Sequence, residues 1–156
     1  MEQTKIIIYG CGVMGLRVAE TLSKKKSFAI VGAIDIDPEL VGKNLGSLLE
    51  GDHNMDISIQ NDPIELFNTV DADAVVLTTL SHLKEVFPQI DQCIQADLNV
   101  VSTCKELSYP WDREPELAID PHSSLSRSPI HQSLTNDGLL EKTDSVSEED
   151  WNRTVP

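Results

Sequence analysis

The chain has 156 residues, 40% of them apolar, and a formal net charge of −14 at pH 7. This length suffices for one ordinary domain with a buried core and is short for two. The negative charge argues against partners such as nucleic acids or anionic membranes, which would repel the chain. No apolar run approaches the length of a membrane span, and the first residues lack a secretory signal pattern. We therefore expect a cytoplasmic protein.

The first predicted element is an apolar strand over residues 5–9, which runs directly into the pattern Gly-x-Gly-x-x-Gly. An amphipathic helix is predicted next, over residues 13–25, with a lysine run at its end that suits the helix dipole. In this context Gly10 can form a tight turn, Gly12 leaves room for a pyrophosphate, and Gly15 lets the helix approach the strand. The predicted cofactor-binding residues of the turn are Gly10, Cys11, Gly12, Val13, Met14 and Gly15.

A second predicted strand, residues 29–34, is followed by Asp35, which lies about 20 residues beyond the last glycine of the turn. A carboxylate at this place can accept hydrogen bonds from the ribose hydroxyls of NAD, and it would repel the 2′-phosphate of NADP. Asp37 is the alternative, although its position before Pro38 better suits a turn or a helix start. The sequence favours NAD as the cofactor and leaves NADP open.

The remaining predicted elements alternate between strand and helix. In chain order they are a short helix within residues 38–49, a strand at 56–60, a helix at 63–67 capped by Asp62, a strand at 72–79, a helix at 83–96 that Pro88 should kink or delay, and a strand at 99–104. This alternation predicts an α/β fold, a Rossmann-type doubly wound and mostly parallel sheet with helices on both faces.

Ligands of such sheets bind beyond the carboxyl ends of the strands. Thr78 and Thr79 end one predicted strand, and Ser102 and Thr103 end the next, so we add these four to the cofactor-binding residues. The catalytic residues are unknown. His82 and Lys105 are weak candidates. An exposed histidine at a helix start is ordinary. Some other Rossmann oxidoreductases carry a catalytic lysine in a place comparable to Lys105, but the surrounding CKEL is not their motif.

The three cysteines, Cys11, Cys93 and Cys104, are widely spaced and odd in number. No CxxC pair indicates zinc or a redox motif, and disulfides are disfavoured in the cytosol. We interpret the cysteines as packing residues and predict no metal site.

Several segments resemble one known family. They are GCGVMG, VGAIDIDPELVGKNLG, DADAVVLTT and, most distinctively, NVVSTCKELSYPW. Across residues 5–118 the chain is similar to the N-terminal half of the 2,4-diaminopentanoate dehydrogenases, relatives of dihydrodipicolinate reductase. The resemblance implies an oxidoreductase that uses NAD(P) to oxidise an amine or reduce an imine on a small, amino-acid-like substrate.

The sequence departs from this family beyond the segment near Asp112. Family members continue into a second, substrate-binding domain, whereas residues 119–156 are serine-rich and acidic here and predict a disordered or irregular tail. We expect a Rossmann domain at 1–118 in a truncated or frameshifted copy, with a genuinely short product as the alternative. Such a chain would bind the cofactor, be catalytically incomplete, and expose apolar surface that favours self-association. A non-catalytic dinucleotide-binding or redox-sensing module is the alternative function.

Overall fold

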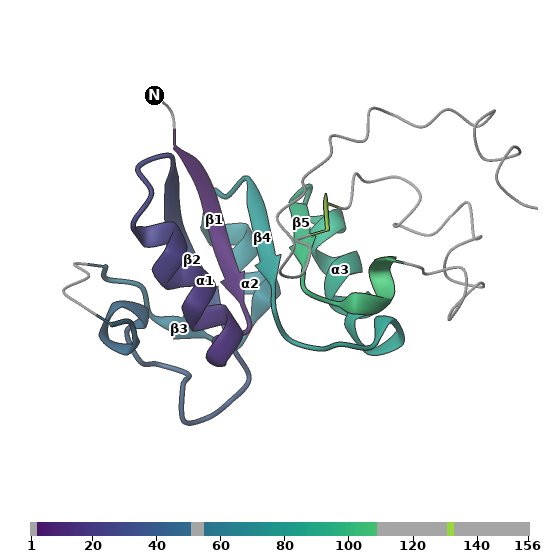
Figure 1. The fold of residues 1–156 in the computed structure, drawn as a ribbon, viewed down its shortest axis with the longest axis horizontal. Helices are drawn as coiled ribbons and strands as arrows, with labels where there is room; N and C mark the ends of the chain where they lie inside the picture. Colours follow the sequence, from purple (N-terminus) through teal and green to yellow (C-terminus); the bar gives the residue numbers. More distant parts are fainter. Residues whose placement is uncertain (1–2, 51–54, 109–130, 133–156) are drawn as a thin grey trace, which may run out of the picture.

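The computed structural model describes residues 3–50, 55–108 and 131–132 (Figure 1). Two short 3-10 helices, η1 and η2, accompany the strands and α-helices. In chain order the elements are β1 (Thr4–Tyr9), α1 (Val13–Ser23), β2 (Phe28–Ile34), η1 (Leu45–Leu48), β3 (Ile59–Gln60), α2 (Pro63–Thr69), β4 (Ala74–Leu77), α3 (Leu83–Gln95), β5 (Asn99–Ser102), η2 (Lys105–Ser108) and β6 (His131–Gln132).

The strands form one parallel sheet in the order β3-β2-β1-β4-β5-β6. From β1 the chain first adds strands on one side and then, at β4, on the other. The strand order therefore reverses between β1 and β4, which is where an open α/β sheet binds its ligand. The carboxyl ends of the strands point downward in Figure 1, and the loops that follow them gather along this rim.

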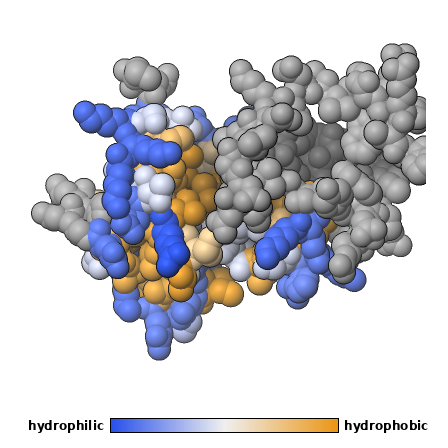
Figure 2. All heavy atoms as spheres, viewed as in Figure 1, coloured by the Kyte–Doolittle hydropathy of each residue, from blue (hydrophilic) through white to orange (hydrophobic). Residues whose placement is uncertain are grey.

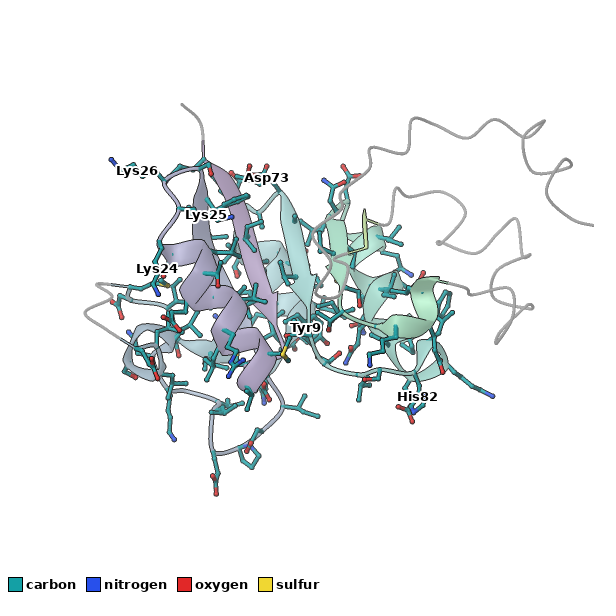
Figure 3. All side chains as sticks on the ribbon, in the orientation of Figure 1. Tyr9, Lys24, Lys25, Lys26, Asp73 and His82 are labelled. Carbon is teal, nitrogen blue, oxygen red and sulfur yellow. The ribbon has the colours of Figure 1, made fainter. Side chains whose placement is uncertain are left out.

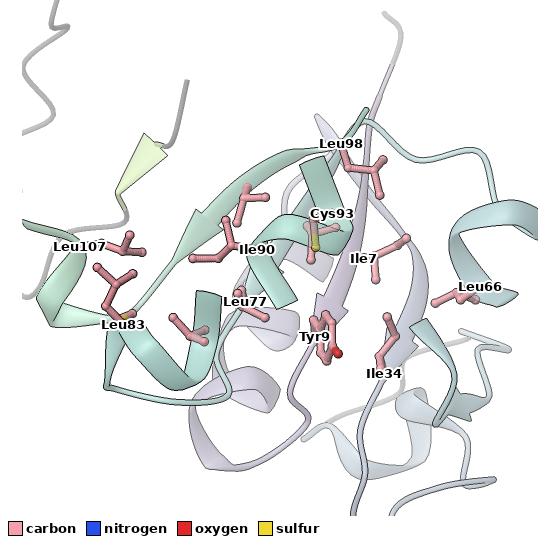
Figure 4. Packing of buried hydrophobic residues seen from close by; sticks show 14 residues of the cluster. Ile7, Tyr9, Ile34, Leu66, Leu77, Leu83, Ile90, Cys93, Leu98 and Leu107 are labelled. Atoms are coloured by element: carbon pink, nitrogen blue, oxygen red, sulfur yellow. The ribbon is translucent and has the colours of Figure 1, made fainter. Parts of the chain in front are cut away.

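Alternate residues of the strands pack into two separate cores, because successive side chains of a strand point to opposite faces. Ile7 and Tyr9 of β1 belong to the core beneath α2 and α3, which Figure 4 shows from close by. Ile6 and Ile8 belong to the other core, to which α1 and η1 contribute. The sheet is thus covered by helices on both faces, as the sequence predicted.

The start of α2 shows how the sequence fixes a local boundary. The Asp62 carboxylate accepts hydrogen bonds from the backbone N–H groups of Ile64 and Glu65, at 2.9 and 3.0 Å, and Pro63 occupies the first turn. A side-chain cap followed by proline is the ordinary way for a helix to begin. The predicted cap is confirmed.

The prediction of a short helix within residues 38–49 is wrong for most of that segment. The chain makes turns there, with Gly42 at a φ of +83°, and only η1 is helical. The Asn44 side chain accepts a hydrogen bond from the Gly46 N–H at 2.8 Å, which supports a tight 3-10 turn in place of an α-helix. Glycines at 42 and 46 disfavour a continuous helix energetically.

Other boundaries differ by a few residues. α1 ends at Ser23 instead of residue 25, and the predicted strand at 56–60 is reduced to β3 because residue 58 makes only an isolated antiparallel bridge to Asn44. Pro88 lies inside α3 and does not delay its start at Leu83.

The predicted division at residue 118 lies outside the described residues, as does most of the predicted tail. Within residues 119–156, the pair 131–132 forms β6, which is parallel to β5. Among the helices that the structure describes, none is long and apolar enough to cross a membrane.

Candidate dinucleotide site

The glycine turn lies at the carboxyl end of β1. Gly10 has a φ of +100°, a conformation that side chains other than glycine rarely tolerate, and its N–H donates to the Ile34 carbonyl at 2.8 Å. A Cβ added to Gly15 would lie 1.7 Å from the Gly10 carbonyl oxygen and 2.9 Å from the Thr78 hydroxyl. The first glycine makes the turn and the last lets α1 cross close over it.

Gly12 differs from these two glycines because nothing lies within 4 Å of a Cβ built on it. It is the N-cap residue of α1, with an extended backbone and no side-chain cap. The N–H groups at a helix start have no partner within the helix, and the helix dipole places positive charge there. Open space in front of these donors fits a pyrophosphate, so the residues present are suited to the group the motif predicts.

Asp35 follows β2 and lies directly beside this turn. Its Oδ2 accepts a hydrogen bond from the Cys11 N–H at 2.5 Å, and its Oδ1 accepts one from the Asp37 N–H at 2.8 Å. The carboxylate therefore joins the glycine turn to the loop after β2, and it remains only partly buried. Asp37 is exposed and accepts from the Glu39 N–H at 2.9 Å, which is the turn role that the sequence suggested.

Thr78 is the first residue after β4, across the point where the strand order reverses. Its N–H donates to the Tyr9 carbonyl at 2.8 Å, and its hydroxyl donates to the Gly10 carbonyl at 2.8 Å. Thr79 instead donates its hydroxyl to Gln89 Oε1 of α3 at 2.5 Å. Thr78 thus belongs to the glycine turn, while the Thr79 hydroxyl is directed to α3.

Ser102 and Thr103, the two residues predicted at the end of β5, differ in burial. Ser102 is 2% exposed, and its hydroxyl accepts a hydrogen bond from the Cys104 N–H at 3.1 Å. Thr103 is half-buried and donates its N–H to the Leu77 carbonyl at 3.1 Å. A ligand at the rim can therefore reach Thr103 more readily than Ser102.

Large apolar side chains are exposed around this rim. Val13 and Met14 at the start of α1 are 74% and 54% exposed, Ile36 after β2 is 82% exposed, and Leu80 after β4 is 40% exposed. Figure 2 shows apolar surface over α1 and toward the lower edge of the face in view. These four residues follow the carboxyl ends of β1, β2 and β4, so they lie along the same rim as the glycine turn.

The two weak catalytic candidates lie after β4 and β5, on one side of β1. His82 is the N-cap residue of α3, and Figure 3 places its exposed side chain on the carboxyl-rim side of the sheet. Lys105 begins η2 and is exposed. Sequence reasoning missed Glu106, whose carboxylate lies 3.1 Å from His82 Nδ1 and accepts from the Leu83 N–H at 2.7 Å. Glu106 lies 24 residues after His82 and 23 after Leu83 in the sequence, so no local pattern reveals these contacts.

All three cysteines are buried and unbridged. Burial raises the pKa of Cys11 to about 12, with a further contribution from the Asp35 charge, and burial raises the pKa of Cys93 to about 12. Burial also raises the pKa of Cys104. These thiols stay neutral near pH 7 and pack in the cores, as the sequence predicted. Within the described ranges, no group of three or more His, Cys, Asp or Glu could hold a metal ion.

A parallel sheet of this strand order, with a glycine turn at the reversal and an acidic residue after the second strand, defines a dinucleotide-binding domain of the Rossmann type. The family model "Dihydrodipicolinate reductase, N-terminus" matches residues 4–105. The chain therefore belongs to this family, and the resemblance found in the sequence is confirmed.

Two relatives support this membership. The chain is 33% identical to 2,4-diaminopentanoate dehydrogenase of Acetoanaerobium sticklandii over 123 residues, which cover 76% of the chain and 33% of that protein. It is 32% identical to the amine dehydrogenase structure from Mycobacterium smegmatis, with a TM-score of 0.67 over 72% of this chain and 33% of the other. The chain thus spans about a third of the length of each.

A more distant structure shares the fold. Scyllo-inositol dehydrogenase from Lactobacillus casei, solved with NAD(H) and scyllo-inositol bound, is 18% identical and has a TM-score of 0.56, covering 85% of this chain and 36% of that one. Together, the family match and the two relatives above show that the chain carries the dinucleotide-binding N-terminal domain of a dehydrogenase family.

Proposed function

We propose that the chain binds NAD at the glycine turn and forms the cofactor-binding part of an oxidoreductase that acts on amines or imines. The observation that carries the proposal is the open space at Gly12, in front of the first N–H groups of α1 and next to the Asp35 carboxylate. The diphosphate would lie against the turn, between β1 and β4, and bound NAD supplies the hydride acceptor.

The position of Asp35 supports NAD over NADP. Cys11 and Asp37 each give one of its oxygens a backbone hydrogen bond, so the carboxylate is held at the end of β2. Each carboxylate oxygen can accept more than one hydrogen bond, so both remain available to ribose hydroxyls. A 2′-phosphate in the same place would meet a negative charge at close range.

The Asp35 assignment is tested by titrating the chain with NADH and NADPH and following nicotinamide fluorescence. We expect Asp35→Asn to weaken NADH binding about tenfold, equivalent to about 1.4 kcal/mol. The difference between the affinities for NADH and NADPH should become smaller. Asp37→Asn is the matched control, with the same charge change two residues away, and should leave both affinities unchanged. Equal effects of the two substitutions, or none from Asp35→Asn, would refute the assignment.

The amine chemistry rests on the similarity to 2,4-diaminopentanoate dehydrogenase and to the amine dehydrogenase. In such a reaction, hydride passes between the substrate carbon and the nicotinamide, while protein groups hold the two in contact. We propose that the described residues serve the cofactor half of this reaction, and that substrate contacts come largely from outside this domain.

This division of roles predicts that the purified chain binds NAD without oxidising 2,4-diaminopentanoate. The measurement follows the absorbance of reduced nicotinamide after the amine and NAD are added to the chain. The Acetoanaerobium sticklandii enzyme serves as the positive control. Turnover by the chain alone would contradict the proposed division of roles.

A further inference from the structure

Glu106 connects two segments that follow neighbouring strands of the sheet. It lies in η2, just after β5, and its two carboxylate oxygens contact two residues at the start of α3, just after β4. Oε2 accepts from the Leu83 N–H at 2.7 Å, and Oε1 lies 3.1 Å from Nδ1 of His82. One side chain therefore engages both the backbone at the start of α3 and the imidazole ring beside it.

This contact gives an acceptor to a backbone N–H group at the start of α3. His82, the N-cap residue, makes no side-chain cap to its own helix, so the Leu83 N–H obtains its acceptor from a distant element. A second link lies alongside, because the Cys104 thiol is 3.2 Å from the Ser81 carbonyl oxygen. Leu83 and Leu107 also belong to the same buried core. The loop after β4 and the segment after β5 are thus connected by two hydrogen bonds and by shared packing.

The pairing determines the chemistry of His82. A carboxylate can only accept, so the bond to Oε1 places a proton on Nδ1, and in the neutral ring Nε2 then carries the free electron pair. The His82 side chain is 70% exposed although Nδ1 is occupied. In the neutral ring the second nitrogen, Nε2, is therefore a hydrogen-bond acceptor.

His82 lies on the side of the site opposite Asp35. A Rossmann sheet binds one nucleotide half on each side of the strand reversal. Asp35 follows β2 and lies on the adenosine side, whereas the segments joined by Glu106 follow β4 and β5. Thr78 links the two sides through its bond to Gly10.

We propose that Glu106 is a positioning residue that fixes His82 in the Nδ1–H form and presents Nε2, as an acceptor, to an N–H donor on the nicotinamide side of the bound dinucleotide. The proposal rests on the proposed function for the identity of the ligand. The fixed proton position does not depend on it.

The proton position is tested by ¹⁵N NMR of the imidazole rings at about pH 8.5, where histidines are generally neutral. The His82 signals are identified by their loss in His82→Gln. We expect the Nδ1–H form in the native chain. In Glu106→Gln the amide can still accept from the Leu83 N–H, while its NH₂ group donates to Nδ1, so the proton should move to Nε2 with the fold retained.

Glu85→Gln is the matched control, because Glu85 is an exposed acid in the first turn of the same helix. This variant should leave the His82 proton on Nδ1. A native chain with its proton on Nε2, or a Glu106→Gln variant with unchanged ring signals, would overturn the positioning role.

The ligand part of the proposal, the contact between His82 Nε2 and the nicotinamide side of the dinucleotide, is tested by adding NADH or ADP-ribose to the ¹⁵N-labelled chain. NADH should shift the Nε2 signal of His82, and ADP-ribose, which lacks the nicotinamide, should leave it in place. Identical responses to both ligands, or no response while fluorescence reports NADH binding, would overturn this part. If fluorescence shows no NADH binding, the proposed function and the ligand part both fail, and the ring tautomer still decides the role of Glu106.

Discussion

At the scale of single residues, substitutions at Gly15 and Gly12 distinguish an effect on the stability of the fold from an effect on NADH binding. Gly15→Ala would bring a methyl group 1.7 Å from the Gly10 carbonyl oxygen and 2.8 Å from its carbon, so backbone must move. We expect a loss of about 1–3 kcal/mol in the free energy of unfolding, typical of overpacking, together with weaker NADH binding. Urea denaturation and fluorescence titration measure the two effects.

Gly12→Ala is the comparison for this prediction, because the added methyl group meets no atom within 4 Å. Stability should change by less than about 1 kcal/mol, because the cost of alanine at an N-cap is offset by the smaller conformational entropy of the unfolded chain. NADH affinity should still fall, since the methyl group would occupy the space that we propose for the pyrophosphate. A Gly12→Ala variant that binds NADH normally would argue against that placement.

The single residues also show where sequence reasoning succeeds. The roles of Gly10 and Gly15 were predictable because the motif has a backbone mechanism that depends on local spacing. Glu106 was not predictable, because its partners come from a loop more than 20 residues away in the chain. Likewise, the sequence could place Ser102 at a strand end but could not show that its hydroxyl would be buried and engaged by the Cys104 N–H.

At the scale of elements, buried strands and capped helices were predicted within a few residues. β1, β4 and β5 are apolar runs, and α2 begins at its own Asp62 cap. The segment 38–49 was mispredicted because its apolar residues suit either a helix or a turn-rich loop packed on the core. Leu45 and Leu49 are buried there without an α-helix, and the positive φ of Gly42 breaks the helical path.

At the scale of the whole molecule, the alternation of elements predicted a parallel, doubly wound sheet, and the structure confirms it. The strand order could not be derived from alternation alone, and β6 was not predicted. The reversal between β1 and β4 brings Gly10, Asp35 and Thr78 together, although they lie far apart in the sequence. Lys24, Lys25 and Lys26 follow the C-terminal end of α1, away from the glycine turn at its start (Figure 3).

The most direct test of the account is to map NADH binding on the backbone amide signals of the whole chain by NMR. We expect shifts concentrated at residues 10–15, 35–37 and 78–82, with the N–H groups of Gly12, Val13 and Met14 among the largest. Shifts concentrated at Lys24, Lys25 and Lys26, or NADH binding that leaves residues 12–14 unaffected, would contradict the placement of the diphosphate at the start of α1.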